Sequence, residues 1–256
     1  MNEKTSVESL GKSIGYWLNS GSPLIAEAVA IQGYDYLCID EQHGFYDFSE
    51  IRNSIVAINA ASRIHTSSQE VYVRVGENDP FLIGRVLDAG ADGVIVPQIS
   101  SIQDAEKLVH SVKYHPLGSR SFGPMRARWR GNTTPGQISS ASAAIAMIET
   151  RAGIENIEGI CSVEGLDGLY IGPSDLAISL GQAPGGQDNE VLENAIAHVR
   201  QHAAESDIRI GIHTFSGEEA YARLSQGFDF ASVASDLTHI QGLARAHLVK
   251  AKELLR

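Results

Sequence analysis

The chain has 256 residues, of which 43% are hydrophobic, and its 31 acidic and 20 basic side chains give a net charge of −11. This length supports a large α/β core, and because no Pro/Gly/Ser linker divides the chain we expect a single domain over residues 1–256. The acidic balance argues against nucleic acid or an anionic membrane as partner, and no apolar run reaches membrane-spanning length.

Apolar runs alternate with helical patterns along the whole chain. Eight runs predict strands, at residues 13–18, 36–40, 71–75, 93–97, 144–148, 168–171, 208–213 and 230–233. Helical patterns cover residues 23–31, 48–60, 80–89, 102–112 and 190–204. Proline-led helix starts lie at 22–23 and 78–80, and glycine helix ends lie at Gly33, Gly90 and Gly227.

Eight β/α units in this length predict a (β/α)₈ TIM barrel, although periodicity alone also fits a doubly wound open sheet. One connection, residues 118–142, is long for a simple barrel, and long loops inside compact domains are usually functional. It carries four arginines, Arg120, Arg126, Arg128 and Arg130. They indicate either a solvated surface or a site for an anionic end of a substrate.

In a barrel, catalytic groups come from the carboxyl ends of different strands. Read in order, those ends carry a polar set: Asp40-Glu41-Gln42-His43-Gly44, Arg74, Pro97-Gln98, Glu149 and Asp175. His43, in a turn after its strand, suits a general base, and the alternative is a structural loop histidine. Arg74 suits a donor fork for a carboxylate or an enolate, and the alternative is a buried ion pair.

Glu149 and Asp175 lie 26 positions apart, each just past an apolar run. A strand, a helix and a strand fit that interval, so the two strands should be parallel neighbours with their carboxyl ends side by side. Two carboxylates with few other fixed ligands suit a Mg²⁺-type ion, which keeps waters and accepts substrate oxygens. The alternative for either residue alone is helix N-capping.

Two further residue types limit the chemistry. None of the six lysines follows a predicted central strand, which argues against Schiff-base chemistry. Cys38 and Cys161 are the only cysteines, and Cys38 lies inside an apolar strand, so we expect no structural disulfide. Together with a polar start that lacks a signal-peptide core, this predicts a cytoplasmic protein.

In these residues and the segments around them, the chain resembles the HpcH/HpaI family of metal-dependent (class II) pyruvate aldolases. The resemblance rests on residues 33–44, 73–74 with 78–80, 87–91, 96–97, 148–150 and 171–176, within a span from about 13 to 236. The last two segments are its most specific marks. It implies a (β/α)₈ barrel of the phosphoenolpyruvate/pyruvate type, commonly a homohexamer (a trimer of dimers) with a C-terminal helix swapped between subunits.

The resemblance also implies residue roles. Glu149 and Asp175 would bind Mg²⁺, Mn²⁺ or Co²⁺, which the 2-oxo acid chelates. His43 would be the base, Asp88 would tune its basicity, Arg74 would stabilise the enolate, and Asp40 would lie beside them. The turn of Gly172, Pro173, Ser174 and Asp175 would bind substrate, with the backbone at Ser174 and Asp175 holding the pyruvyl carboxylate.

The sequence departs from the family pattern at two places. Gln42 stands where the family often has glutamate, and Met147 stands where several members have glutamine. Both departures leave the metal and the base intact and bear on the choice of substrate. We therefore predict an aldolase that cleaves a 4-hydroxy-2-oxo acid to pyruvate, or a close 2-oxo acid, and an aldehyde. The alternatives are a related acyl-CoA lyase or decarboxylase, and a non-catalytic 2-oxo-acid-binding protein.

Overall fold

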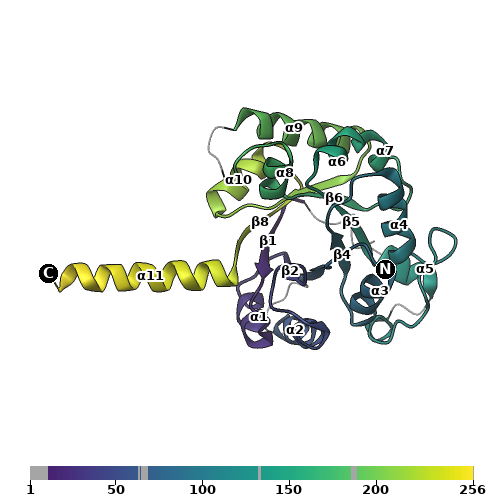
Figure 1. Ribbon diagram of the computed structural model, residues 1–256. Helices are drawn as coiled ribbons and strands as arrows, with labels where there is room; N and C mark the ends of the chain where they lie inside the picture. Colours follow the sequence, from purple (N-terminus) through teal and green to yellow (C-terminus); the bar gives the residue numbers. More distant parts are fainter. Residues whose placement is uncertain (1–10, 63, 65–68, 132–133, 186–188, 256) are drawn as a thin grey trace.

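Eight parallel strands close into a barrel in the order of the sequence in the computed structural model, which describes residues 11–62, 64, 69–131, 134–185 and 189–255 (Figure 1). The strands are β1 (Ser13–Leu18), β2 (Tyr36–Asp40), β3 (Glu70–Arg74), β4 (Gly93–Val96), β5 (Ala143–Ile148), β6 (Gly168–Ile171), β7 (Arg209–Ile212) and β8 (Phe230–Ser235). Because β8 also pairs with β1, the sheet has no free edge. The predicted (β/α)₈ barrel is confirmed and the open sheet is excluded.

Helices follow the strands around the outside of the barrel. They are α1 (Pro23–Ala30), α2 (Phe48–Ala61), α3 (Pro80–Asp88), α4 (Ile102–Val112), α5 (Pro135–Ser140), α6 (Arg151–Glu155), α7 (Ile157–Cys161), α8 (Pro173–Ser179), α9 (Glu190–Glu205), α10 (Gly217–Ser225) and α11 (Asp236–Leu254). Gly33, Gly90 and Gly227 all adopt positive φ, as the predicted helix ends require. No helix in the described part of the chain is long and apolar enough to cross a membrane.

The barrel interior is filled mainly by aromatic and aliphatic side chains, so open space begins only at its ends. Trp17, Tyr36, Tyr72, Tyr170 and Phe230 belong to this inner cluster. Gly15 on β1 makes room for it, because a Cβ at that position would lie 2.0 Å from the ring of Tyr36. A larger apolar layer lies between the outer face of the strands and the helices.

The long connection between α4 and β5 lies at the amino end of the barrel. It contains a short 3₁₀ helix, Ala127–Arg130, and α5. Arg120 forms an ion pair with Asp88, the last residue of α3, at 2.6 Å, and the backbone N–H of Arg126 donates to the Asp88 carbonyl. The connection therefore packs on the end of α3 that points away from the carboxyl ends of the strands.

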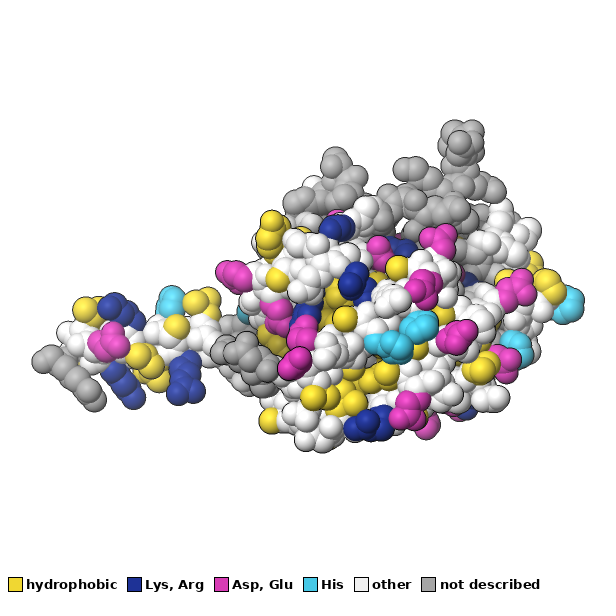
Figure 2. Space-filling view, turned by 90° about the horizontal axis from the view of Figure 1, so that it is seen from above, with side chains coloured by type: hydrophobic (Ala, Val, Ile, Leu, Met, Phe, Trp, Pro, Cys, Tyr) yellow, Lys and Arg dark blue, Asp and Glu magenta, His cyan; other side chains and the backbone are white. Residues whose placement is uncertain are grey.

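Helix α11 leaves the barrel after β8 and projects away from it (Figure 1). Only Asp236, its first residue, is buried. Ile240, Leu243 and Leu248 are 50%, 64% and 55% exposed, and Figure 2 shows such hydrophobic side chains among charged ones along the projecting helix. Within one chain, the body of α11 therefore lacks the packing that usually stabilises an amphipathic helix.

Candidate active site

Asp40 and Arg74 lie side by side where β2 and β3 end. The parallel register pairs these two residues, and alternation along each strand places them on the same inward face as Cys38 and Tyr72. Arg74 donates from Nε to Asp40 Oδ1 at 2.9 Å and from Nη2 to Asp40 Oδ2 at 2.7 Å. Arg74 is 7% exposed and Asp40 is 1% exposed, so the two form a buried, bidentate ion pair.

The ion pair with Asp40 uses two of the three guanidinium nitrogens of Arg74 and leaves Nη1 for other contacts. Its Nη1 lies 4.0 Å from Met147 Sδ, which is a weak acceptor, and the guanidinium carbon lies 4.5 Å from the centre of the Trp17 ring. The buried ion pair expected as one alternative is therefore present, while the role of Arg74 as a donor to a carboxylate or an enolate stays a prediction at the pocket that Arg74 lines.

His43 lies in the turn between β2 and α2. The turn is held from both sides, because His43 N donates to Asp40 Oδ1 at 3.3 Å and Phe45 N donates to the Asn19 carbonyl at 2.8 Å. The His43 side chain lines the same pocket as Arg74. A histidine on a fixed turn beside a pocket has the placement that a general base needs.

Glu149 follows β5 and is only 3% exposed. Its Oε1 accepts a hydrogen bond from Gln98 N at 2.8 Å, and Gln98 adopts a φ of 56°, which is uncommon outside glycine. Burial raises the pKa of Glu149, and the nearby charge of Asp175 raises it further. The two carboxylates therefore interact, as their placement on neighbouring strands predicts.

Neither carboxylate caps a helix. The N-cap of α6 is Thr150, whose side chain accepts from Gly153 N, and α8 begins after Gly172 without a side-chain cap. This excludes the capping alternative. Among the residues that the structure describes, no three His, Cys, Asp or Glu side chains form a metal cluster. A cation here would take these two carboxylates and fill its remaining positions from water or substrate.

The site opens into a pocket of about 390 Å³ at the carboxyl end of the barrel. It is lined by residues from seven strand ends and from the first turns of α8 and α11: Trp17, Asn19, Asp40, His43, Arg74, Met147, Gly172, Pro173, Ser174, Asp175, His213, Phe215, Ser235, Leu237 and Thr238. Glu149 lies directly behind this wall, because a Cβ on Gly172 would be 2.8 Å from its Oε2.

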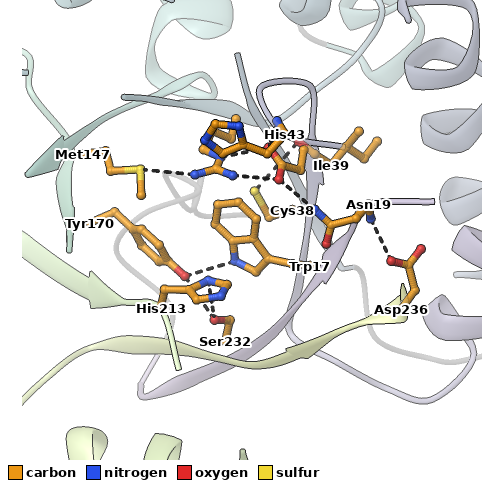
Figure 3. Close-up of polar contacts among 12 residues, drawn as sticks. Trp17, Asn19, Cys38, Ile39, His43, Met147, Tyr170, His213, Ser232 and Asp236 are labelled. Atoms are coloured by element: carbon orange, nitrogen blue, oxygen red, sulfur yellow. Dashed lines mark hydrogen bonds and ion pairs between the residues drawn. The ribbon is translucent and has the colours of Figure 1, made fainter. Parts of the chain in front are cut away.

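Several lining residues were not expected from the sequence. Trp17 donates from Nε1 to the Tyr170 hydroxyl at 3.0 Å, and His213 Nδ1 lies 3.2 Å from Ser232 Oγ (Figure 3). Burial, with the charge of Arg74, lowers the pKa of His213 to about 4, so its ring is neutral near pH 7. The signal that could have found Trp17 and His213 is their place at the ends of β1 and β7.

Asp88 is the one predicted site residue that a single chain keeps far from the others. It closes α3, which runs back to the amino end of the barrel, and its partner there is Arg120. Burial raises the pKa of Asp88, while Arg120 counteracts this. Neither Asp88 nor Arg120 lines the pocket.

Two further arginines of the long connection lie against aromatic rings. The guanidinium carbons of Arg126 and Arg128 lie 5.5 Å and 5.0 Å from the ring centres of Trp129 and Phe122. The side chain of Arg130 lies outside the described part of the structure. Within one chain, the described arginines of this connection thus make structural contacts and do not reach the pocket.

The two departures from the family pattern lie close to the site. Met147 lines the pocket beside Arg74. Gln42 precedes His43 in the turn, and within the described residues its Oε1 is buried without a hydrogen-bond partner.

Known proteins match this chain over nearly its full length. It is 41% identical over 241 residues to a hydroxypyruvate/pyruvate aldolase from Rhizorhabdus wittichii, covering 93% of each chain. It is 33% identical over 242 residues to a 2-dehydro-3,6-dideoxy-6-sulfogluconate aldolase from Pseudomonas putida, covering 93% of this chain and 92% of the other.

A similar solved structure is an HpcH/HpaI aldolase/citrate lyase family protein from Burkholderia cenocepacia, with a TM-score of 0.87, 29% identity and coverage of 96% of each chain. The sequence itself matches this family over residues 13–241, which include all eight strands. The chain therefore belongs to the HpcH/HpaI aldolase/citrate lyase family.

Proposed function

We propose that this carbon–carbon lyase cleaves 4-hydroxy-2-oxo acids to pyruvate, or a close 2-oxo acid, and an aldehyde, and that it also catalyses the reverse aldol addition. One observation carries the proposal: His43, Arg74 and Asp175 line one pocket at the carboxyl end of the barrel, with Glu149 directly behind its wall. These groups supply a base, an oxyanion donor and paired carboxylates.

Glu149 and Asp175 would hold a divalent cation, Mg²⁺, Mn²⁺ or Co²⁺. The two carboxylates fit such an ion, because burial and the charge of Asp175 raise the pKa of Glu149. A positive ion would offset the repulsion between the two negative charges and stabilise both ionised groups. When bound, the ion would act as a Lewis acid on the 2-oxo acid and draw negative charge away from its carbon skeleton.

Arg74 would stabilise the negative charge that develops on the 2-oxo oxygen. Its Nη1, which lies 4.0 Å from Met147 Sδ, would donate to that oxygen while the other two nitrogens are fixed by Asp40, so the donor would be oriented before the reaction. Such preorganised donors contribute about 3–4 kcal/mol to transition-state stabilisation in other enzymes.

His43 would move the proton. In cleavage it accepts the proton of the C4 hydroxyl, the C3–C4 bond breaks to release the aldehyde, and the electron pair enters the enolate, which takes up a proton at C3. The pyruvyl carboxylate would lie at the first turn of α8, where Ser174 and Asp175 line the pocket and no side chain caps the helix. Backbone N–H groups at such a turn favour an anion.

Exchange of the pyruvate methyl protons with deuterium, followed by NMR on protein loaded with Mg²⁺ or Mn²⁺, tests this function. We expect exchange in wild type, its loss in chelator, and a reduction of about 10²–10⁴-fold in His43→Ala. His198→Ala, on the exposed face of α9, is the matched control and should exchange at the wild-type rate. Exchange that persists in His43→Ala would place the base elsewhere, and binding without exchange would favour the 2-oxo-acid-binding alternative.

Helix α11 supports a second proposal, that the chain assembles into a homohexamer, a trimer of dimers, in which α11 packs on another subunit. A 19-residue helix with exposed Ile240, Leu243 and Leu248 requires apolar cover that its own barrel does not provide. Asp88 could act on His43 only from another copy, because within one chain the two residues belong to opposite ends of the barrel. Light scattering should show the hexamer for wild type and smaller species for Leu243→Glu.

A further inference from the structure

The carboxylate of Asp40 accepts four hydrogen bonds. Besides Nε and Nη2 of Arg74, it accepts from His43 N at 3.3 Å and from Asn19 Nδ2 at 2.7 Å. A carboxylate has about four lone-pair sites, so this one is fully used. Because Asp40 is 1% exposed, water cannot replace a lost donor without local rearrangement.

Asn19 contacts both parts of the catalytic machinery. Its side chain holds Asp40, and its carbonyl accepts from Phe45 N at 2.8 Å, at the far end of the turn that carries His43. The fit is close, because a Cβ on Gly44 would lie 3.2 Å from the Asn19 Cα. Asn19 thus supports Arg74 through a side chain and the His43 turn through the main chain.

Asn19 is itself fixed by the start of α11. Asp236, 2% exposed, accepts from Asn19 N at 2.8 Å (Figure 3). It also accepts from Ser20 N at 3.1 Å. The same carboxylate accepts from Leu237 N at 2.9 Å, in the first turn of the helix. A continuous series of hydrogen bonds therefore runs from the base of α11 to Arg74.

We propose that Asn19 and Asp236 are positioning residues that connect the base of α11 to Arg74 and to the His43 turn through Asp40. The inference rests on the proposed function, because it assigns their effect to the reaction of the same site. Small displacements of catalytic groups cost up to about 100-fold in rate. Loss of either link should therefore reduce turnover more than it weakens binding of the 2-oxo acid.

The test measures pyruvate proton exchange in Asn19→Ala and in the near-isosteric Asn19→Asp and Asp236→Asn. Each should lower the exchange rate by roughly tenfold to a hundredfold while the KM for pyruvate changes by less than about threefold. Asn53→Ala, on the exposed face of α2, is the matched control and should match wild type. Wild-type exchange rates in folded Asn19→Ala and Asp236→Asn would overturn the inference.

A double-mutant cycle separates positioning from general loss of stability. If Asn19 acts through Asp40 on Arg74 as well as on the His43 turn, then the double variant Asn19→Ala with Arg74→Lys should slow exchange by clearly less than the product of the two single effects. Fully multiplicative effects would show that Asn19 acts independently of Arg74 and would overturn the inference.

A readout independent of catalysis keeps the two proposals distinguishable. If wild type does not exchange pyruvate protons, the proposed function is wrong, and positioning is then read from nitrogen-15 NMR of the Arg74 Nε–H. That proton, bonded to Asp40, should exchange with water faster in Asn19→Ala and Asp236→Asn than in wild type. An unchanged rate of exchange between the Arg74 Nε–H and water would overturn the positioning role of Asn19 and Asp236.

Discussion

Gly172 leaves free the space in which the carboxylate of Glu149 lies. A Cβ at residue 172 would lie 2.8 Å from Glu149 Oε2 and 2.6 Å from Met147 Cε. The backbone there has a φ of −98°, so alanine would meet no conformational strain and would act only through this contact.

Gly172→Ala should therefore displace Glu149 and weaken divalent-metal binding by about tenfold or more, equivalent to about 1.4 kcal/mol. Calorimetric titration of metal-free protein with Mn²⁺ measures this. Gly84→Ala, where a new Cβ meets nothing within 4 Å, is the control and should keep wild-type affinity. Equal affinities in all three proteins would place the cation away from Glu149.

Arg74→Lys should reduce turnover by about 10²–10³-fold and change pyruvate binding much less. The guanidinium holds Asp40 with two nitrogens and offers the third to the pocket, whereas one ammonium group cannot keep both arrangements. Steady-state kinetics of wild type, of Arg74→Lys and of Arg52→Lys, an exposed control on α2, provide the comparison. An unchanged turnover number would make Arg74 a purely structural residue.

The partly buried His213 predicts a specific acid sensitivity. Because its folded-state pKa is about 4, below the usual 6.5, the unfolded chain takes up this proton first as the pH falls. The free energy of unfolding should therefore decrease from about pH 6.5 down to about pH 4, by at most about 1.4 kcal/mol per pH unit. Urea unfolding of wild type and His213→Gln should show a shallower decrease in the variant, and parallel curves would contradict the assignment.

Pyruvate and borohydride should leave no stoichiometric adduct on the protein. Lys113, the buried lysine among the described residues, donates from Nζ to Asp167, to the Ser139 carbonyl and to the Ser142 carbonyl near the start of β5, opposite the pocket. No described lysine lines the pocket. Mass spectrometry after treatment, with activity measured once the reagents are removed, checks this, and one lysine carrying a pyruvyl group would overturn the proposed mechanism.

The barrel was predictable because buried parallel strands are short apolar runs with turn signals between them. The same order places Asp40, Arg74 and Glu149 at strand ends, where alternation along the strand turns them inward, and it places Asp175 in the first turn of the helix that follows β6. Trp17 and His213 occupy equivalent places, yet their residue types are common in cores. Only the packing shows that they line a pocket.

Three-dimensional contacts outside strand order could not be obtained from the sequence. Asn19 and Asp236 lie more than two hundred positions apart and meet because the closed barrel brings β1 and β8 together. The strained backbone of Gln98, which directs an N–H to Glu149, follows no glycine signal. The sequence placed Asp88 at a helix end, but the direction of α3 determines that this end lies opposite the pocket.

Trp17 also gives the molecule an internal optical reporter. The chain has two tryptophans: Trp17, 2% exposed beneath Arg74, and Trp129, 75% exposed at the other end of the barrel. An aqueous quencher such as acrylamide should reach Trp129 and spare Trp17. The fluorescence that survives quenching therefore arises beside the pocket, so occupancy of the site can be followed in unlabelled protein without any chemical turnover.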